Sequence, residues 1–103
     1  SNVFHVYVDD ARTGPVNNAY EADWHEWIIC RNIDQVKVLL QAGLVNDLDL
    51  DYDMGQGAKK TGLALTEWMI EHDCWPQGKV YVHSTHPDAL NMIKLIKEYQ
   101  PKK

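Results

Sequence analysis

Four short runs of apolar residues, rich in β-branched and aromatic side chains, are interspersed with segments of helical periodicity, and this order leaves few folds open to the chain. The first run, residues 3–8, is apolar at nearly every position, as is typical of a strand buried on both faces of a parallel sheet. Strands are predicted over residues 3–8, 24–31, 48–53 and 80–82. Helices are predicted over residues 32–43, 61–73 and 87–101.

The boundaries of these segments carry signals of their own. Asn32 and Gln35 form a capping box at the start of the first predicted helix, and Gly43 is a typical helix stop. Residues 11–23 contain Gly14 and Pro15 and are predicted to form a loop. The resulting order, in which helices connect most of the strands, indicates an α/β fold with a mostly parallel sheet and right-handed connections.

Length and composition limit the organisation of the chain and its partners. The 103 residues allow one domain, placed at residues 3–101, and Ser1 and Asn2 are interpreted as a tag remnant. A net charge of −5 argues against a duplex nucleic-acid groove and against binding to anionic membranes. No apolar run reaches the roughly 18 residues of a membrane span, and no signal-peptide pattern is seen, so a cytoplasmic location is predicted. Cys30 and Cys74 lack metal-ligand spacing and are interpreted as structural thiols.

Acidic residues stand at the carboxyl ends of two predicted strands, where ligands bind in parallel sheets. These residues are Asp9 and Asp10 after the first strand, and Asp51 and Asp53 at the end of the third. If the two strands are neighbours, carboxylates about 4 Å apart repel by roughly 4 kcal/mol at an effective dielectric near 20, which favours uptake of a proton or a cation. Mg²⁺ is the predicted occupant, and Ca²⁺ or Mn²⁺ would also suit oxygen ligands. The alternative is that these Asp residues end strands because Asp favours turns.

Residues near the end of the fourth strand and in the first loop extend this candidate site. His83 directly follows the fourth strand, where it can act as a general acid or base, bind a metal, or be a structural histidine. Ser84 and Thr85 offer hydroxyl and N–H groups to a phosphate at the start of the last helix. Arg12 is a candidate for a bidentate phosphate contact, the alternative being a solvated loop residue. His86 is interpreted as a helix-start residue.

The segment from Gly55 to Gly62 is rich in glycine and lysine but does not have the spacing of a P-loop. It is predicted to be a mobile loop at the same edge of the sheet. Its residues Lys59 and Lys60 can approach an anion there.

A set of short motifs, spread over nearly the whole chain, resembles the cyclic-phosphate-processing receiver-like family, a divergent branch of the response-regulator receiver domains. The shared residues are Asp9-Asp10-Ala11-Arg12 with Pro15, Leu50-Asp51-Tyr52-Asp53-Met54-Gly55, Thr61-Gly62 with Trp68, Trp75-Pro76, and Val82-His83-Ser84 with Pro87 and Asn91-Met92. The chain departs from the family pattern at Tyr52, where a His is common, and at His86, in place of an Asn.

The resemblance implies a compact receiver-like (flavodoxin-like), mostly parallel four-stranded sheet with about three helices. The first helix would be replaced by a loop, and a fifth strand would be missing. The implied activity is that of a metal-dependent phosphoesterase acting on cyclic or modified phosphates, including cyclic nucleotides. Asp9, Asp10, Asp51 and Asp53 would then hold the metal, with Asp51 and His83 as the catalytic residues, and Arg12, Ser84 and Thr85 would bind the substrate.

Two other functions remain open from the sequence. A receiver-type signalling domain would be phosphorylated on Asp51, but it needs a lysine from a fifth strand, for which Lys59 and Lys60 are the available substitutes. A non-catalytic module that binds a nucleotide or phosphate is the second alternative. Its stacking platforms would be Tyr20, Trp24 or Trp75, which are otherwise cover for the sheet.

Overall fold

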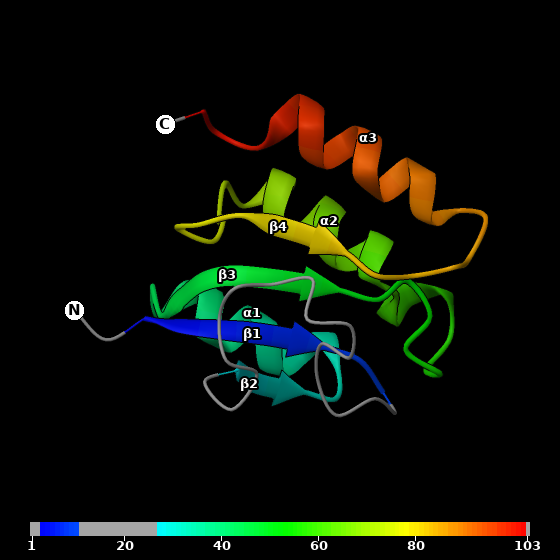
Figure 1. Ribbon diagram of the computed structural model, residues 1–103, viewed down its shortest axis with the longest axis horizontal. Coiled ribbons are helices and arrows are strands. Elements are labelled where there is room, and N and C mark those ends of the chain that lie inside the picture. Colours follow the sequence, from blue (N-terminus) through cyan, green and yellow to red (C-terminus); the bar gives the residue numbers. More distant parts are fainter. Residues whose placement is uncertain (1–2, 11–26, 103) are drawn as a thin grey trace.

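The computed structural model describes residues 3–10 and 27–102. In this part of the chain, four parallel strands form one sheet with the order β2-β1-β3-β4, and three α-helices and one 3₁₀ helix connect or follow them (Figure 1). The strands are β1 (Phe4–Val8), β2 (Trp27–Cys30), β3 (Val45–Leu50) and β4 (Val80–Val82). The helices are α1 (Ile33–Gln41), η2 (Ala58–Lys60), α2 (Gly62–Glu71) and α3 (Ala89–Tyr99). The predicted α/β receiver-like class is confirmed.

The predicted helix boundaries are set by the capping residues. The Asn32 side chain accepts a hydrogen bond from the Gln35 backbone N–H at 3.0 Å, and Gln35 Oε1 accepts one from the Arg31 N–H at 2.8 Å. Gly43, with φ +71°, follows the last turn of α1 in the left-handed conformation that glycine adopts without strain. At α2, Thr61 is the N-cap and its hydroxyl accepts from the Ala64 N–H at 3.1 Å.

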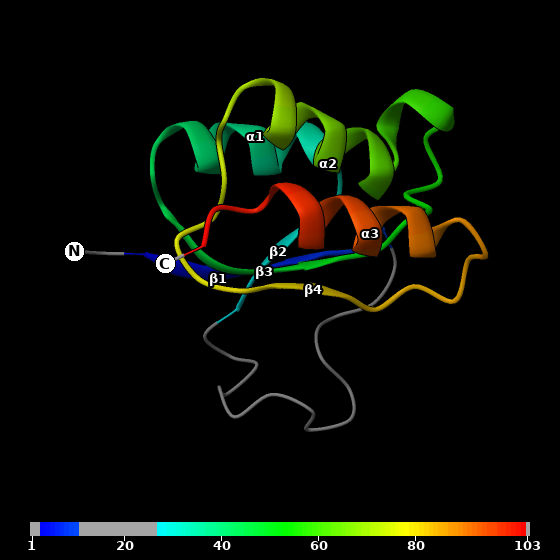
Figure 2. The same cartoon turned by 90° about the horizontal axis from the view of Figure 1, so that it is seen from above.

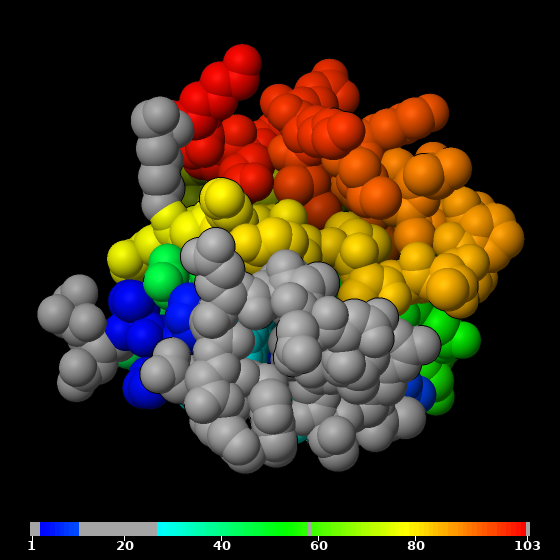
Figure 3. All heavy atoms as spheres, viewed as in Figure 1, coloured from blue at the N-terminus to red at the C-terminus, as the bar shows by residue number. Residues whose placement is uncertain are grey.

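The three α-helices lie on one side of the sheet (Figure 2). The space-filling view shows α3, in orange and red, packed against the yellow β4 (Figure 3). Toward these helices the strands present the helix-side face of the sheet, made of alternate apolar residues such as Val6, Val8, Leu48 and Leu50, all with no exposed surface. This face and the buried helix residues form the core of the described domain.

The strand residues that alternate with the apolar ones point to the other side of the sheet. They form its polar face, which includes His5, Tyr7, Asp49 and Tyr81. The register places Tyr7 beside Asp49, and Asp49 beside Tyr81, on adjacent strands. Tyr7 and Asp49 are buried. Burial on both faces, predicted for the first strand, therefore holds for residues 6–8, although the two faces differ in chemistry.

Predicted and observed bounds differ at the third strand and at the end of the second strand. The third strand begins at Val45 and ends at Leu50, earlier than predicted. The polar residues Asn46 and Asp47 belong to the strand because β3 pairs with β1 and because both residues accept hydrogen bonds from the turn at residues 77–79. Asp51 therefore follows the strand. The second strand ends at Cys30, one residue before its predicted end, and residues 24–26 lie outside the described part. In α3, Tyr99 is 49% exposed, and Gln100 after the helix donates from Nε2 to the Gly78 carbonyl oxygen at 3.1 Å.

Candidate functional site

A pocket with a volume of about 350 Å³ lies at the carboxyl edge of the sheet. Its lining comes from the segments that follow β1, β3 and β4, because the carboxyl ends of parallel strands meet at one edge. The lining residues are Asp9, Asp10, Asp51, Asp53, Ser84, Thr85 and His86. Six of the predicted site residues are therefore brought together around one pocket.

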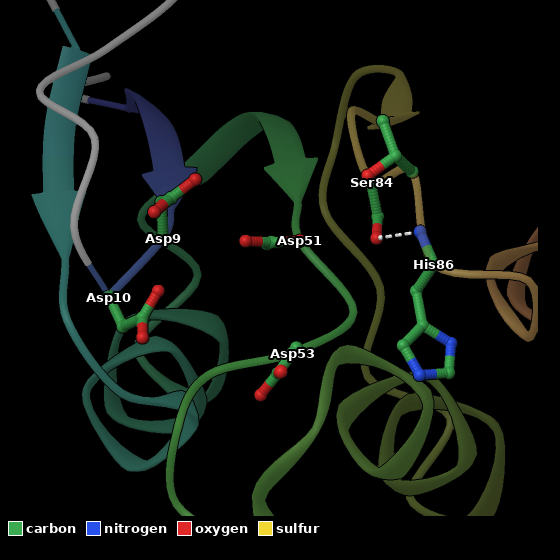
Figure 4. Close-up of a pocket in the computed structure, with 7 residues that line it drawn as sticks. Asp9, Asp10, Asp51, Asp53, Ser84 and His86 are labelled. Carbon is green, nitrogen blue, oxygen red and sulfur yellow. Dashed lines mark hydrogen bonds between the residues drawn. The ribbon is translucent and has the colours of Figure 1, made fainter.

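Asp9 and Asp51 form the centre of this group. Asp9 is 1% exposed, and in Figure 4 its carboxylate and that of Asp51 point toward one another. One ligand atom from each of Asp9, Asp51 and His83 lies within 4.8 Å of the other two. Burial and the negative charge of Asp9 raise the pKa of Asp51, even though the charge of His83 lowers it. The ionised carboxylates therefore repel one another.

A hydrogen bond and a close backbone approach hold Asp51 in place. Its Oδ1 accepts from the Tyr52 N–H at 2.8 Å. Ser84, which lines the same pocket, accepts at Oγ from the His86 N–H at 3.1 Å (Figure 4). At the start of α2, Gly62 is required because a Cβ there would overlap the Asp51 carbonyl oxygen. The Thr-Gly motif is thus a packing device that brings α2 against the site.

His83 lies just behind the pocket, between two carboxylates. Its Nδ1 is 2.6 Å from Asp49 Oδ1, its Nε2 is 2.9 Å from Asp9 Oδ2, and its ring stacks on Tyr7 with centroids 4.6 Å apart. Burial lowers the pKa of His83, but the hydrogen bonds and charges of Asp49 and Asp9, with the charge of Asp51, raise it overall. Since ionised carboxylates are acceptors, both ring nitrogens can donate when the ring is an imidazolium, the form that the raised pKa favours. While these bonds persist, His83 has no lone pair for a metal.

Asp49 is one of two residues at the site that the sequence analysis missed. It is fully buried within β3, and its Oδ2 has no hydrogen-bond partner among the described residues. Its signal was a charged residue between the apolar residues Leu48 and Leu50 of a strand, a position where a buried charge is rare without a partner. That signal was available, but it does not reveal the partner.

Arg31 was missed as well. It directly follows β2, and its Nη1 donates to the Asp9 carbonyl oxygen at 3.1 Å. Its position one residue after a strand, at the same edge as the acidic residues, was the signal. Arg31 brings positive charge to this edge of the sheet and fixes the backbone of Asp9.

Asp10 and Asp53 line the outer part of the pocket and are exposed. Asp53 Oδ1 accepts from the Gly55 N–H at 2.8 Å, which is the local turn that Asp favours. Gly55 has φ +67°, and a Cβ there would lie 2.8 Å from Asp10 Oδ2. The four predicted carboxylates therefore divide into a buried or half-buried inner pair and an exposed outer pair.

Other predicted site residues differ in their placement. Arg12, Tyr20 and Trp24 lie outside the described residues. Lys60 pairs with Asp34 on α1 at 2.6 Å, whereas Lys59 is exposed. These two predictions concern the same loop, in which η2 replaces part of the predicted irregular segment.

Aromatic residues flank the pocket at one end. His86 stacks on Tyr52 with centroids 4.1 Å apart and an interplanar angle of 17°. His86 Nδ1 accepts from the Asp88 N–H at 3.0 Å, in keeping with its predicted place before the last helix. Trp75 is half-buried against the core, which supports its interpretation as cover.

The donor set fits a hard divalent cation. When ionised, Asp9, Asp49 and Asp51 carry three negative charges, and a protonated His83 carries one positive charge, so these four neighbouring side chains can hold two net negative charges. Carboxylate oxygens are the ligands that Mg²⁺ and Ca²⁺ prefer. A divalent cation between Asp9 and Asp51 would balance the charge and relieve the repulsion that raises the pKa of Asp51.

Comparison with known proteins gives one family. The model described as Cyclic-phosphate processing Receiver domain matches residues 4–98. No curated protein and no solved structure gives a significant match. Among the described residues, no helix combines the length and the apolar character needed to cross a bilayer.

Proposed function

The chain belongs to the cyclic-phosphate processing receiver domain family, and from this premise we propose that it is a metal-dependent phosphoesterase for cyclic or otherwise modified phosphates. The observation that carries the proposal is the convergence of Asp9, Asp51 and His83 within 4.8 Å beside an open pocket. A small phosphorylated ligand of the cyclic-nucleotide type suits the size of this pocket.

The carboxylates are assigned to metal binding. Asp9 and Asp51 are the direct ligands, and Asp10 and Asp53 lie far enough out to bind the waters that Mg²⁺ retains. A bound Mg²⁺ would supply positive charge to stabilise the phosphoryl oxygens in the transition state. Asp51 is the catalytic carboxylate in this assignment, since it is half-buried and faces the pocket directly.

His83 is assigned as the proton donor to the leaving oxygen. It is held as an imidazolium, the form a general acid requires, and Nε2 is the nitrogen on the side of Asp9. Its proton now lies against Asp9 Oδ2. Transfer therefore requires the leaving oxygen to share, or take the place of, that carboxylate as acceptor.

The phosphate itself is assigned to the segment after β4. Ser84 and Thr85 line the pocket and precede α3, where hydroxyl and N–H groups suit an anion. Ser84 and Asp51 line the same pocket, so a phosphate bound to Ser84 would lie beside the inner carboxylate pair. We retain Arg12 as a further candidate for phosphate binding from outside the described residues.

The direct test is hydrolysis of a panel of 2′,3′- and 3′,5′-cyclic nucleotides and terminal cyclic phosphates with Mg²⁺ or Mn²⁺. The wild type should open the cyclic ester, and Asp51→Asn should abolish turnover. Glu71→Gln, which removes one exposed carboxylate on α2 outside the pocket, is the matched control and should keep the wild-type rate. Absence of turnover by the wild type over the whole panel would contradict the enzymatic proposal.

A non-catalytic nucleotide-binding module is the second candidate, favoured by the stacked Tyr52–His86 pair beside the pocket. A nucleobase can stack on such a pair while its phosphate lies near Ser84. Calorimetry with non-hydrolysable nucleotides separates the two candidates, because tight binding without turnover supports the module alone.

A receiver-type signalling domain is the other alternative. No strand follows β4 among the described residues, and Lys60 is engaged with Asp34. If this alternative held, an acyl-phosphate mimic such as beryllofluoride would bind at Asp51 and shift the NMR signals of the residues that line the pocket.

A further inference from the structure

We propose that Asp49 is a positioning residue, which holds the metal-binding carboxylate of Asp9 in place through the ring of His83. This inference rests on the proposed function and adds to it a residue outside the pocket lining. Asp49 would act on the cation without touching it.

The three side chains form a continuous hydrogen-bonded chain. Asp49 Oδ1 lies 2.6 Å from His83 Nδ1, and His83 Nε2 lies 2.9 Å from Asp9 Oδ2. The side chains are 0%, 11% and 2% exposed, respectively, so little water competes for these bonds. Because each imidazole nitrogen has a single in-plane direction, fixing Nδ1 also fixes the direction in which Nε2 points.

Packing keeps the ring from turning out of this line. Tyr7 on β1, the strand on the other side of β3 from β4, stacks on His83 with an interplanar angle of 8°. Rotation of the imidazole would break the stack and both hydrogen bonds together. The ring therefore transmits the position of Asp49, which is set by the rigid strand β3, to the carboxylate of Asp9 at the pocket.

The cost of burying Asp49 supports a role beyond packing. A carboxylate inside a sheet is destabilising unless it is paired and its oxygens are satisfied. Asp49 Oδ2 has no hydrogen-bond partner among the residues the structure describes, so the His83 contact is the interaction that accounts for this buried charge. An apolar residue at this position would fit the sheet at lower cost.

The test compares two aspartates on the same face of the same strand. Asp49→Ala removes the acceptor for His83 Nδ1, whereas Asp47→Ala removes a carboxylate that binds His5 and the Lys79 N–H at the other end of β3. Mn²⁺ binding is measured by electron paramagnetic resonance at a temperature at which circular dichroism shows both variants folded. Loss of an outer hydrogen-bond partner weakens metal binding by about 10- to 100-fold, and that range is expected for Asp49→Ala. Asp47→Ala should bind as the wild type does.

Asp49→Asn is the conservative variant, because its side-chain oxygen can still accept from Nδ1. It should recover part of the affinity that Asp49→Ala loses, which a purely structural role would not produce in two folded proteins. Wild-type affinity in folded Asp49→Ala would overturn the inference.

A measurement on the wild type keeps the inference testable if Asp49→Ala does not fold. Nitrogen-15 NMR of His83 should show a hydrogen-bonded proton on Nδ1, the nitrogen that faces Asp49. An Nδ1 without a hydrogen-bonded proton would break the link to Asp49 and overturn the inference.

The two proposals fail in different ways. Mn²⁺ binding that depends on Asp49, without turnover of any cyclic phosphate, would remove the enzymatic proposal and support this one. A wild type that binds no Mn²⁺ would overturn both.

Discussion

The two faces of the sheet bury their side chains by opposite chemistry. The helix-side face buries apolar residues such as Val6, Leu48 and Leu50 against α-helices, and the buried core cluster of the described residues contains no charged side chain. The polar face buries Asp49 and encloses His83, which leads to Asp9 at the pocket. Leu48 and Asp49, successive residues of one strand, thus lie on opposite faces: Leu48 packs in the apolar core and Asp49 contacts His83.

This difference separates stability from function within a single sheet. Apolar burial stabilises the fold by roughly 25 cal/mol per Å² of surface removed from water. A buried charge contributes little net stability even when paired, and it is costly when its partner is lost. The polar face is therefore the side on which the molecule departs from the most stable packing, as expected where a site is built.

The largest effect expected from a single change on the helix-side face is on stability. Leu48→Ala should lower the free energy of unfolding by about 2–5 kcal/mol, because it leaves a cavity in a fully buried position. Mn²⁺ affinity, measured where the variant is folded, should not change. A folded Leu48→Ala protein that had lost the metal would show that the two faces are not separable; urea unfolding and metal titration on the same sample decide this.

A smaller effect is expected at Gly62, where the helix layer meets the site. Gly62→Ala places a methyl group into the Asp51 backbone and within 2.7 Å of Met92 Cε, so overpacking should cost about 1–3 kcal/mol. Unlike Leu48→Ala, it should also weaken Mn²⁺ binding, because it displaces Asp51. Thermal unfolding and metal titration are the measurements. Unchanged metal affinity, despite a lower melting temperature, would mean that the position of α2 does not control Asp51.

The pH dependence of stability follows from the polar face and should be modest. The pKa of His83 is raised above its ordinary value of 6.5, since the carboxylates around it outweigh the effect of burial. The stability contributed by its charged form is fully present below pH 6.5 and is lost as the pH rises through the folded-state value. The raised pKa of Asp51 also lowers the stability of the fold as the pH rises, over the interval from its ordinary value of 3.8 to its raised folded-state value.

The melting temperature of the protein in a chelator should therefore fall as the pH is raised above neutrality, and His83→Gln should flatten this fall. Differential scanning fluorimetry across a pH series provides the measurement. A melting temperature that rises over this interval would contradict the assignment of His83 as a buried cation.

The smallest effect concerns Cys30, a titratable group on the helix-side face. Burial raises the pKa of its thiol to about 11, so the thiol stays neutral on this face, whereas the polar face pairs its buried charge with a partner. In a Cys74→Ser variant, Cys30 should react with a thiol reagent at pH 8 only as fast as the protein unfolds. The Cys30→Ser variant gives the reaction rate of the half-buried Cys74 for comparison. Prompt reaction of Cys30 in the native protein would show that this face opens more readily than its packing implies.

Sequence patterns predicted the features that depend on topology. Helices connecting apolar runs predicted the parallel sheet, and the sheet placed Asp9 and Asp51 at one edge with Ser84. The division of the acidic residues into inner and outer pairs was not predictable, because it depends on the turn closed by Asp53 and Gly55. Sequence spacing does not specify such local geometry.

The role of Asp49 depends on register. Pairing of Leu50 with Val82 brings Asp49 to the ring of His83, and a shift of one residue would have turned Asp49 to the helix-side face. The contact of Arg31 with the Asp9 carbonyl oxygen similarly depends on the pairing of Val8 with Cys30. Apolar periodicity identifies strands without fixing these alignments.

Paramagnetic broadening by Mn²⁺ tests the central assignment most directly. In an amide NMR spectrum of the full chain, substoichiometric Mn²⁺ should first broaden residues 9–10, 51–53 and 84–86, and excess Mg²⁺ should reverse the broadening. Asp51→Asn should remove this pattern. Broadening centred elsewhere, or none at these residues, would contradict a cation site between Asp9 and Asp51.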